Sequence, residues 1–258
     1  MIQVDMPTLA LPGGAIPVLG LGTWQAQGTA AERAVSAALQ LGYRHIDTAT
    51  MYRNEEEVGR ALSTVGIDRD DVFVTTKLPP ERVGRERRTL TESLVALNLD
   101  HLDLWLIHWP PGGDAAPRTW EAFRAARDEG LVRSIGVSNY SVAQIDQLVE
   151  ATGEAPAVNQ IPYSPADHDP GLLAAHRDRG VVVEGYSPLK RSDLRAPALV
   201  DAAAAHGVTP AQVVLRWHLQ HDVVVIPKST DRQRLAANLD VVGFELTEQE
   251  MARIDALA

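Results

Sequence analysis

The chain has 258 residues, a formal net charge of −10 and no cysteine. Its 45% hydrophobic and 22% charged residues are typical of a folded globular protein and exclude a largely disordered chain. The lack of cysteine excludes disulfides, thiolate catalysis and cysteine-bearing zinc sites, and the acidic balance argues against nucleic acid as a main partner.

The first fourteen residues do not have the pattern of a secretory signal, in which a basic segment precedes an apolar one. No apolar run in the sequence approaches the roughly 20 residues that a membrane-spanning helix needs. We therefore expect a cytoplasmic protein with no membrane partner.

The chain opens with a predicted β-hairpin, in which Thr8–Leu11 and Ala15–Val18 flank the turn residues Pro12-Gly13-Gly14. Short apolar strands then alternate with amphipathic helices. The predicted strands are Leu19–Gly22, His45–Asp47, Val72–Thr76, Leu102–Ile107, Ser134–Val137, Val158–Gln160, Val181–Tyr186 and Val223–Pro227. The predicted helices include Ala30–Leu41, Glu55–Val65, Arg85–Leu97, Pro117–Glu129, Val142–Glu150, Pro170–Arg179, Pro210–Gln220 and a last one at Glu248–Leu257.

This alternation predicts a parallel sheet covered by helices. Eight strand-helix units in a chain of this length fit a closed (β/α)₈ barrel, an α/β fold, better than an open sheet. We expect one domain over residues 1–258, with the hairpin capping the N-terminal end of the barrel.

Active sites of such barrels lie at the carboxyl ends of the strands. Asp47, Lys77 and His108 each close one of three consecutive predicted strands, and Tyr52 follows Asp47 by five residues. A single strand-end Asp or Lys is usually a cap or a surface charge. Four such residues at one end of the barrel indicate a common site.

These four residue types suit the reduction of a carbonyl group. The carbonyl oxygen needs a proton as hydride arrives, and Tyr52 can donate one although a free tyrosine has a pKa of about 10. The charge of Lys77 is expected to lower that pKa, and Asp47 to hold Lys77 in place. His108 can orient the carbonyl oxygen through a hydrogen bond.

The fourth predicted strand has an alternation of its own. Leu104 and Leu106 should face inward with His108, whereas Trp105 should face outward and pack on a helix. Trp24 and Trp109 follow strand ends and are candidates for the wall of a substrate pocket.

Three segments resemble the signatures of the aldo-keto reductase superfamily. They are Gly42-Tyr43-Arg44-His45-Ile46-Asp47-Thr48-Ala49 with Tyr52, Glu55, Val58 and Gly59; Arg133-Ser134-Ile135-Gly136-Val137-Ser138-Asn139-Tyr140; and Ile226-Pro227-Lys228-Ser229-Thr230 with Arg234. The segments Ile107-His108-Trp109-Pro110 and Tyr186-Ser187-Pro188-Leu189 also match. The resemblance covers nearly the whole chain and is closest to the prokaryotic branch that reduces diketo-sugar acids and methylglyoxal.

The resemblance implies an NADPH-dependent carbonyl reductase on a (β/α)₈ barrel. It implies a catalytic tetrad of Asp47, Tyr52, Lys77 and His108. Ser138, Asn139 and Gln160 would contact the nicotinamide carboxamide, Tyr186 would stack on the ring, and Ser187 and Leu189 would hold the pyrophosphate. Further cofactor contacts are implied at Gly22 and Thr23, and an adenine contact at Asn238.

The residues after the last predicted strand favour NADPH over NADH on independent grounds. Lys228 ends that strand, Ser229 and Thr230 are expected to begin the next helix, and Arg234 lies one turn into it. A helix N-terminus with two cations beside it is a site for an anion such as the adenosine 2′-phosphate. The chain has no G-x-G-x-x-G motif, so a Rossmann fold is not supported.

The chain departs from its relatives in several places. Ala237 replaces an acidic residue before Asn238, and Asp231 stands where a basic residue is common in the prokaryotic branch. Pro162 and Ser164 replace Glu and His beside Gln160. The chain ends directly after its last helix, which predicts an open pocket with a relaxed preference among carbonyl substrates.

Two other functions compete with the reductase. A metal-dependent hydrolase would use His45 and Asp47 with His108 as ligands, but no later strand end completes the set, and we expect no metal. A nucleotide-sensing module would keep the cofactor site but would not need Tyr52 or Lys77. We expect a monomer that binds a small carbonyl compound.

Overall fold

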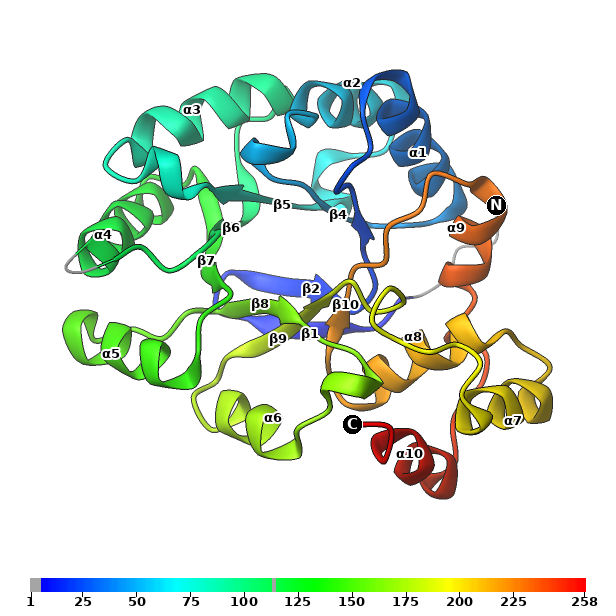
Figure 1. The fold of residues 1–258 in the computed structure, drawn as a ribbon. Coiled ribbons are helices and arrows are strands. Elements are labelled where there is room, and N and C mark those ends of the chain that lie inside the picture. Colours follow the sequence, from blue (N-terminus) through cyan, green and yellow to red (C-terminus); the bar gives the residue numbers. More distant parts are fainter. Residues whose placement is uncertain (1–5, 113–114) are drawn as a thin grey trace.

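The computed structural model describes residues 6–112 and 115–258 (Figure 1). The expectations of a single domain over 1–258 and of no N-terminal signal also cover residues 1–5 and 113–114, which lie outside the described residues.

Eight parallel strands form one sheet in chain order, with helices around it (Figure 1). The strands are β3 (Leu21–Gly22), β4 (His45–Asp47), β5 (Phe73–Leu78), β6 (Leu102–Ile107), β7 (Val132–Ser138), β8 (Val158–Pro162), β9 (Val182–Tyr186) and β10 (Val224–Val225). Parallel bridges from Leu19 to Val225 and from Gly22 to Lys228 join the first strand to the last. The sheet therefore closes into the predicted (β/α)₈ barrel.

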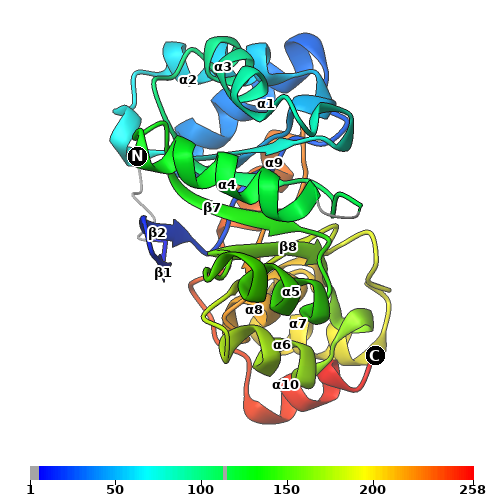
Figure 2. The same ribbon diagram turned by 90° about the vertical axis from the view of Figure 1, so that its left-hand side faces the viewer.

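Helices connect successive strands and cover the outside of the sheet (Figure 2). They are α1 (Gly28–Leu41), α2 (Glu55–Val65), α3 (Glu86–Leu97), α4 (Ala115–Asp128), α5 (Val142–Thr152), α6 (Pro170–Arg177), α7 (Pro197–His206), α8 (Pro210–Gln220), α9 (Arg232–Leu239) and α10 (Glu248–Asp255). The predicted helices occur within a few residues of their expected bounds.

Two helices differ from the prediction. Helix α7 was not predicted, because Pro197–His206 is alanine-rich and lacks the polar face by which an amphipathic helix is recognised. Helix α9 begins at Arg232 and not at Ser229-Thr230. Asp231 is its N-cap, and the Asp231 carboxylate accepts a hydrogen bond from the backbone N–H of Arg234 at 2.9 Å.

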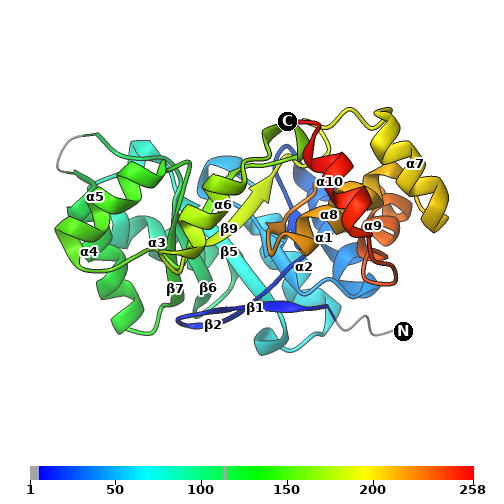
Figure 3. The same ribbon diagram turned by 90° about the horizontal axis from the view of Figure 1, so that it is seen from below.

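The N-terminal hairpin has the predicted place. Strands β1 (Thr8–Leu11) and β2 (Gly14–Pro17) pair antiparallel and lie across one end of the barrel (Figures 2 and 3). Leu11 and Ile16 are buried in the cluster that fills this end of the barrel interior. The turn sits so close to the barrel that a Cβ on Gly13 would lie 1.9 Å from the Arg133 carbonyl oxygen. Only glycine fits at that position.

The core has an inner and an outer layer. Leu104 and Leu106 belong to the inner cluster, whereas Trp105 points outward and stacks on Phe123 of α4, with ring centroids 3.7 Å apart. The predicted alternation of β6 is thereby confirmed. Because His108 continues the inward face, it is carried to the carboxyl end of the barrel interior.

No single helix among the described residues is long and apolar enough to cross a membrane. Helices α7 and α8 reach the required length and composition only when taken together, as a pair bent by 93°.

Candidate active site

A cavity of about 510 Å³ opens at the carboxyl ends of the barrel strands. The predicted site residues that line it are Gly22, Trp24, Asp47, Tyr52, His108, Trp109, Ser138, Asn139, Gln160, Tyr186, Ser187, Leu189 and Lys228. Trp24 and Trp109 lie at its rim with 51% and 45% of their surface exposed. The fold thus brings both tryptophans and three of the four tetrad residues to one cavity.

The fourth tetrad residue, Lys77, lies beneath the cavity and is paired with Asp47. Its Nζ donates to both carboxylate oxygens of Asp47 at 2.7 Å and to the Thr48 carbonyl oxygen at 2.7 Å. Lys77 is fully buried and Asp47 is 2% exposed. Burial alone would lower the pKa of Lys77, but Asp47 and Tyr52 raise it above its ordinary value, so the ammonium keeps its charge.

Tyr52 ends a short 3₁₀ helix, Thr50–Tyr52, which the Thr50 hydroxyl ties to the Lys77 carbonyl oxygen at 3.0 Å. The Lys77 ammonium lies 5.1 Å from the centre of the Tyr52 ring, and Trp24 packs on that ring with centroids 4.9 Å apart. Burial raises the pKa of Tyr52, and Lys77 only partly opposes this effect. The charge of Lys77 thus acts in the expected direction, but burial has the larger effect on the pKa, and Tyr52 is held in its protonated form.

His108 faces the edge of the Tyr52 ring, with centroids 5.8 Å apart. Burial and the charge of Lys77 lower the pKa of His108 to about 3, so the imidazole is neutral. Its Nδ1 is buried and has no hydrogen-bond partner among the described residues. A neutral imidazole can orient a carbonyl oxygen by hydrogen bonding, but it is a poor candidate for an imidazolium acid.

The other wall of the cavity comes from β7, β8 and β9. Asn139 has a left-handed backbone with φ of 63°, and its side chain donates to the His108 carbonyl oxygen at 3.0 Å and accepts from the Tyr186 hydroxyl at 2.9 Å. The Ser138 hydroxyl donates to the Gln160 carbonyl oxygen at 2.8 Å. These bonds fix the side chains at the positions where the resemblance places the nicotinamide.

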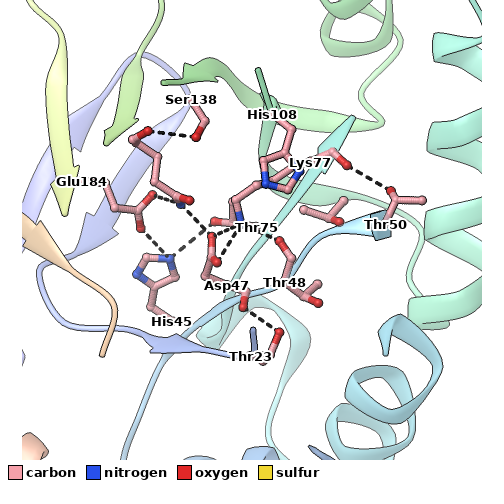
Figure 4. Close-up of polar contacts among 12 residues, drawn as sticks. Thr23, His45, Asp47, Thr48, Thr50, Thr75, Lys77, His108, Ser138 and Glu184 are labelled. Carbon is pink, nitrogen blue, oxygen red and sulfur yellow. Dashed lines mark hydrogen bonds and ion pairs between the residues drawn. The ribbon is translucent and has the colours of Figure 1, made fainter. Parts of the chain in front are cut away.

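Below this wall lies a residue whose role the sequence did not indicate. Glu184 of β9, labelled in Figure 4, is fully buried. Its Oε2 accepts from Gln160 Nε2 at 2.7 Å. The same Nε2 donates to Asp47 Oδ2 at 2.8 Å. Gln160 is directly opposite Glu184 in the β8–β9 register, so both side chains face the interior. This register was the signal that could have connected Glu184 to the site.

The three residues that a metal-dependent hydrolase would use do not form a metal site. His45 Nδ1 lies 3.3 Å from the Pro17 carbonyl oxygen, and its Nε2 faces Thr75 and Glu184, while Asp47 is engaged by Lys77. Within residues 6–112 and 115–258, the one group of three with metal-ligand spacing is His168, His221 and Asp255, none of which lines the cavity.

The predicted cofactor residues outside the cavity fall into two groups. Thr23 is buried, and its hydroxyl donates to the Asp47 carbonyl oxygen at 3.0 Å, which supports the strand end. The second group follows Lys228 in the chain and consists of Ser229, Thr230, Arg234 and Asn238. Arg234 Nε lies 3.4 Å from the Ser229 hydroxyl. Thr230 and Arg234 are exposed, and Ser229 and Asn238 are buried.

The departures from the family pattern have structural counterparts. The carboxylate of Asp231 caps α9, which places a negative charge beside the cations of this segment. Ser164 is buried, and its hydroxyl donates to Asp167 at 2.6 Å. Nothing in the structure explains the exchange to Pro162.

Comparison with known proteins identifies the family of this chain. Residues 18–258 match the model of the aldo/keto reductase family. An aldo-keto reductase of Mycolicibacterium smegmatis is 46% identical over 95% of this chain and 90% of its own length. The methylglyoxal reductase DkgA of Escherichia coli is 40% identical over the same shares.

Solved structures give the same result. An aldo/keto reductase from Brucella melitensis superposes with a TM-score of 0.95 at 41% identity, covering 98% of this chain and 100% of that one. An aldo-keto reductase of Bombyx mori, solved in complex with NADP, has a TM-score of 0.92 at 34% identity and covers 98% of this chain and 93% of its own. This chain is therefore a member of the aldo/keto reductase family and an oxidoreductase.

Proposed function

We propose that this protein reduces aldehydes and ketones to alcohols with NADPH, and that Tyr52 is the general acid. The observation that carries the proposal is the position of the buried Lys77–Asp47 pair beneath Tyr52, at the floor of a cavity of about 510 Å³. The family and the NADP complex of the Bombyx mori relative support this choice of cofactor.

The donor set of the cavity fits a nicotinamide cofactor. Asn139 and Gln160 offer amide groups for the carboxamide, and the half-buried Tyr186 offers a flat ring for stacking. Lys228 and Arg234 provide cations for the 2′-phosphate, which NADH lacks. When bound, the cofactor supplies the hydride to the carbonyl carbon.

The residues of the chain would then handle the proton. The carbonyl oxygen would lie between the Tyr52 hydroxyl and the neutral His108 ring, and negative charge on that oxygen would be met by the proton of Tyr52. The Lys77 ammonium stabilises the tyrosinate that remains. Asp47 keeps Lys77 in place, and Trp24 and Trp109 offer apolar walls to the remainder of the substrate.

Loss of NADPH absorbance with a nitrobenzaldehyde tests the proposal, with NADH in a parallel reaction. The similarity to the methylglyoxal reductase of E. coli makes methylglyoxal the second substrate to test. We expect turnover with NADPH well above NADH. Binding of NADPH without turnover of either carbonyl would favour the nucleotide-sensing module, and a lack of NADPH binding would refute the proposal altogether.

We further propose that the chain acts as one domain and as a monomer in the cytoplasm. The proposed catalytic groups Asp47, Tyr52, Lys77 and His108 come together within one barrel, which supports a monomer that carries its own catalytic groups. Light scattering of the purified protein tests the monomer, and a mass of twice 28.0 kDa would contradict it.

A further inference from the structure

The amide of Gln160 is clamped between two carboxyl groups. Its Nε2 donates one hydrogen to Asp47 Oδ2 at 2.8 Å and the other to Glu184 Oε2 at 2.7 Å. A carboxamide nitrogen has two hydrogens, so both are used below the cavity floor. The amide oxygen is then the group of Gln160 that is left for a ligand, and it can only accept.

The ring of His45 packs against Glu184 and determines which kind of hydrogen bond Glu184 can make there. Its Nδ1 lies 3.3 Å from the Pro17 carbonyl oxygen, which can only accept, so Nδ1 carries the hydrogen. Burial lowers the pKa of His45 to about 3, and the ring is therefore neutral. Its Nε2 is then a bare acceptor, facing the Thr75 hydroxyl at 3.4 Å and Glu184 Oε1 at 3.5 Å.

Glu184 is surrounded in a way that favours its neutral form. Its Oε1 is buried without a hydrogen-bond partner among the described residues, which is costly for a carboxylate but suits an O–H that points at the acceptor Nε2 of His45. Lys77 is the cation of this cluster, and Asp47 already binds it through both oxygens. Burial and the Asp47 charge raise the pKa of Glu184 to about 8.

We propose that Glu184 is a positioning residue that acts as a neutral acid, holding the Gln160 amide so that its oxygen accepts a hydrogen bond from the nicotinamide carboxamide. This inference rests on the proposed function. The neutral form matters because an ionised Glu184 would place a second negative charge beside the Lys77–Asp47 pair and raise the pKa of Lys77 further. That charge would weaken the support of Lys77 for a tyrosinate at Tyr52.

Two substitutions separate the shape of Glu184 from its charge. Glu184→Gln keeps an oxygen for Gln160 and an N–H for His45, so we expect kcat at pH 7 to stay within about threefold of wild type. Glu184→Leu removes both partners and frees the Gln160 amide. We expect kcat to fall by about 10- to 100-fold, by more than the NADPH dissociation constant rises, because a misplaced nicotinamide slows hydride transfer more than it weakens binding.

The pH profile provides a readout that a purely structural role would not change. The charged and titratable groups facing Glu184 are His45 and Asp47 from β4 and Lys77 from β5. As Glu184 ionises near pH 8, turnover of the wild type should fall, and this fall should be absent in Glu184→Gln. A tenfold loss of kcat in Glu184→Gln at pH 7, or identical profiles for the two proteins, would overturn the proposal.

Infrared spectroscopy of the cofactor-free proteins tests the proton without any turnover. The wild type minus Glu184→Gln difference spectrum at pH 7 should contain the carbonyl stretch of a protonated carboxyl, and a carboxylate band in its place would overturn the neutral form. This decides the matter even if Glu184→Leu does not fold. A wild type that consumes no NADPH would refute the proposed function and the role toward nicotinamide, while the infrared band would still report the protonation of Glu184.

Discussion

Replacing Lys77 by Met tests the buried ion pair directly. The substitution removes an ammonium that makes three hydrogen bonds at 2.7 Å and leaves Asp47 buried, with Gln160 as its remaining side-chain partner among the described residues. Removing one member of a buried pair costs about 3–5 kcal/mol. Asp47 can limit the loss by taking up a proton. Protonating a carboxyl with an ordinary pKa of 3.8 at pH 7 costs about 4 kcal/mol, at about 1.36 kcal/mol for each pH unit between the two values.

The two estimates agree, and the second predicts a dependence on pH. In Lys77→Met the folded state holds a proton on Asp47 that the unfolded state releases above pH 3.8, so the loss of stability grows as the pH rises. We expect a loss of about 4 kcal/mol at pH 7 that shrinks to about 2 kcal/mol at pH 5. The melting temperature should fall by roughly 8–16 °C at pH 7.

Urea unfolding followed by circular dichroism at both pH values measures these losses. The double variant Lys77→Met, Asp47→Asn provides the control, because it removes the stranded charge and should be more stable at pH 7 than Lys77→Met alone. A loss below about 1 kcal/mol at pH 7, or one that does not change between pH 5 and pH 7, would refute the reasoning that Lys77 and Asp47 form an ionised buried pair.

Three further predictions follow from the site. Tyr52→Phe should lower kcat at least about 10²-fold, because only the proton donor is lost, while NADPH binding followed by fluorescence stays within about twofold; substantial turnover would show that Tyr52 is not the acid. The double variant Lys228→Ala, Arg234→Ala should raise the KM for NADPH at least about tenfold and leave the KM for NADH unchanged. An equal effect on both KM values would show that this segment does not bind the 2′-phosphate. Burial raises the pKa of Glu184 from 4.5 to about 8, so between these pH values the folded state holds a proton that the unfolded state releases. The free energy of unfolding of the wild type should therefore decline as the pH rises from 4.5 to about 8. Urea unfolding of Glu184→Gln should lack this decline, and the same pH dependence in both proteins would contradict the prediction.

The tetrad was predictable because its geometry depends on topology. Parallel strands end at the same side of a barrel, so the order of Asp47, Lys77 and His108 along the chain was enough to bring them together. The inward direction of His108 followed from the period of two along β6, with Trp105 on the opposite face. The roles of these residues in the reaction remain predictions.

Other features depended on distances that the sequence does not contain. The direction of the Tyr52 pKa results from a balance between burial and the charge of Lys77, and burial is a property of the packed site. The link from Glu184 to Gln160 depends on the register between β8 and β9. The start of α9 depended on whether Thr230 or Asp231 caps it, and both are residue types that cap helices.

The bridge between Leu19 and Val225 has a consequence for the order of folding. The strand that begins the barrel has no neighbour on one side until the strand that ends it has been made. During synthesis the growing sheet must therefore expose an open edge for almost the whole time that the chain is being made. The hydroxyl of Tyr43 likewise lacks its acceptor until late in synthesis, because it donates to the carbonyl oxygen of Leu235, 192 positions later. Barrel closure is thus a late event, and a newly made chain depends until then on staying free of edge-to-edge contact with its neighbours.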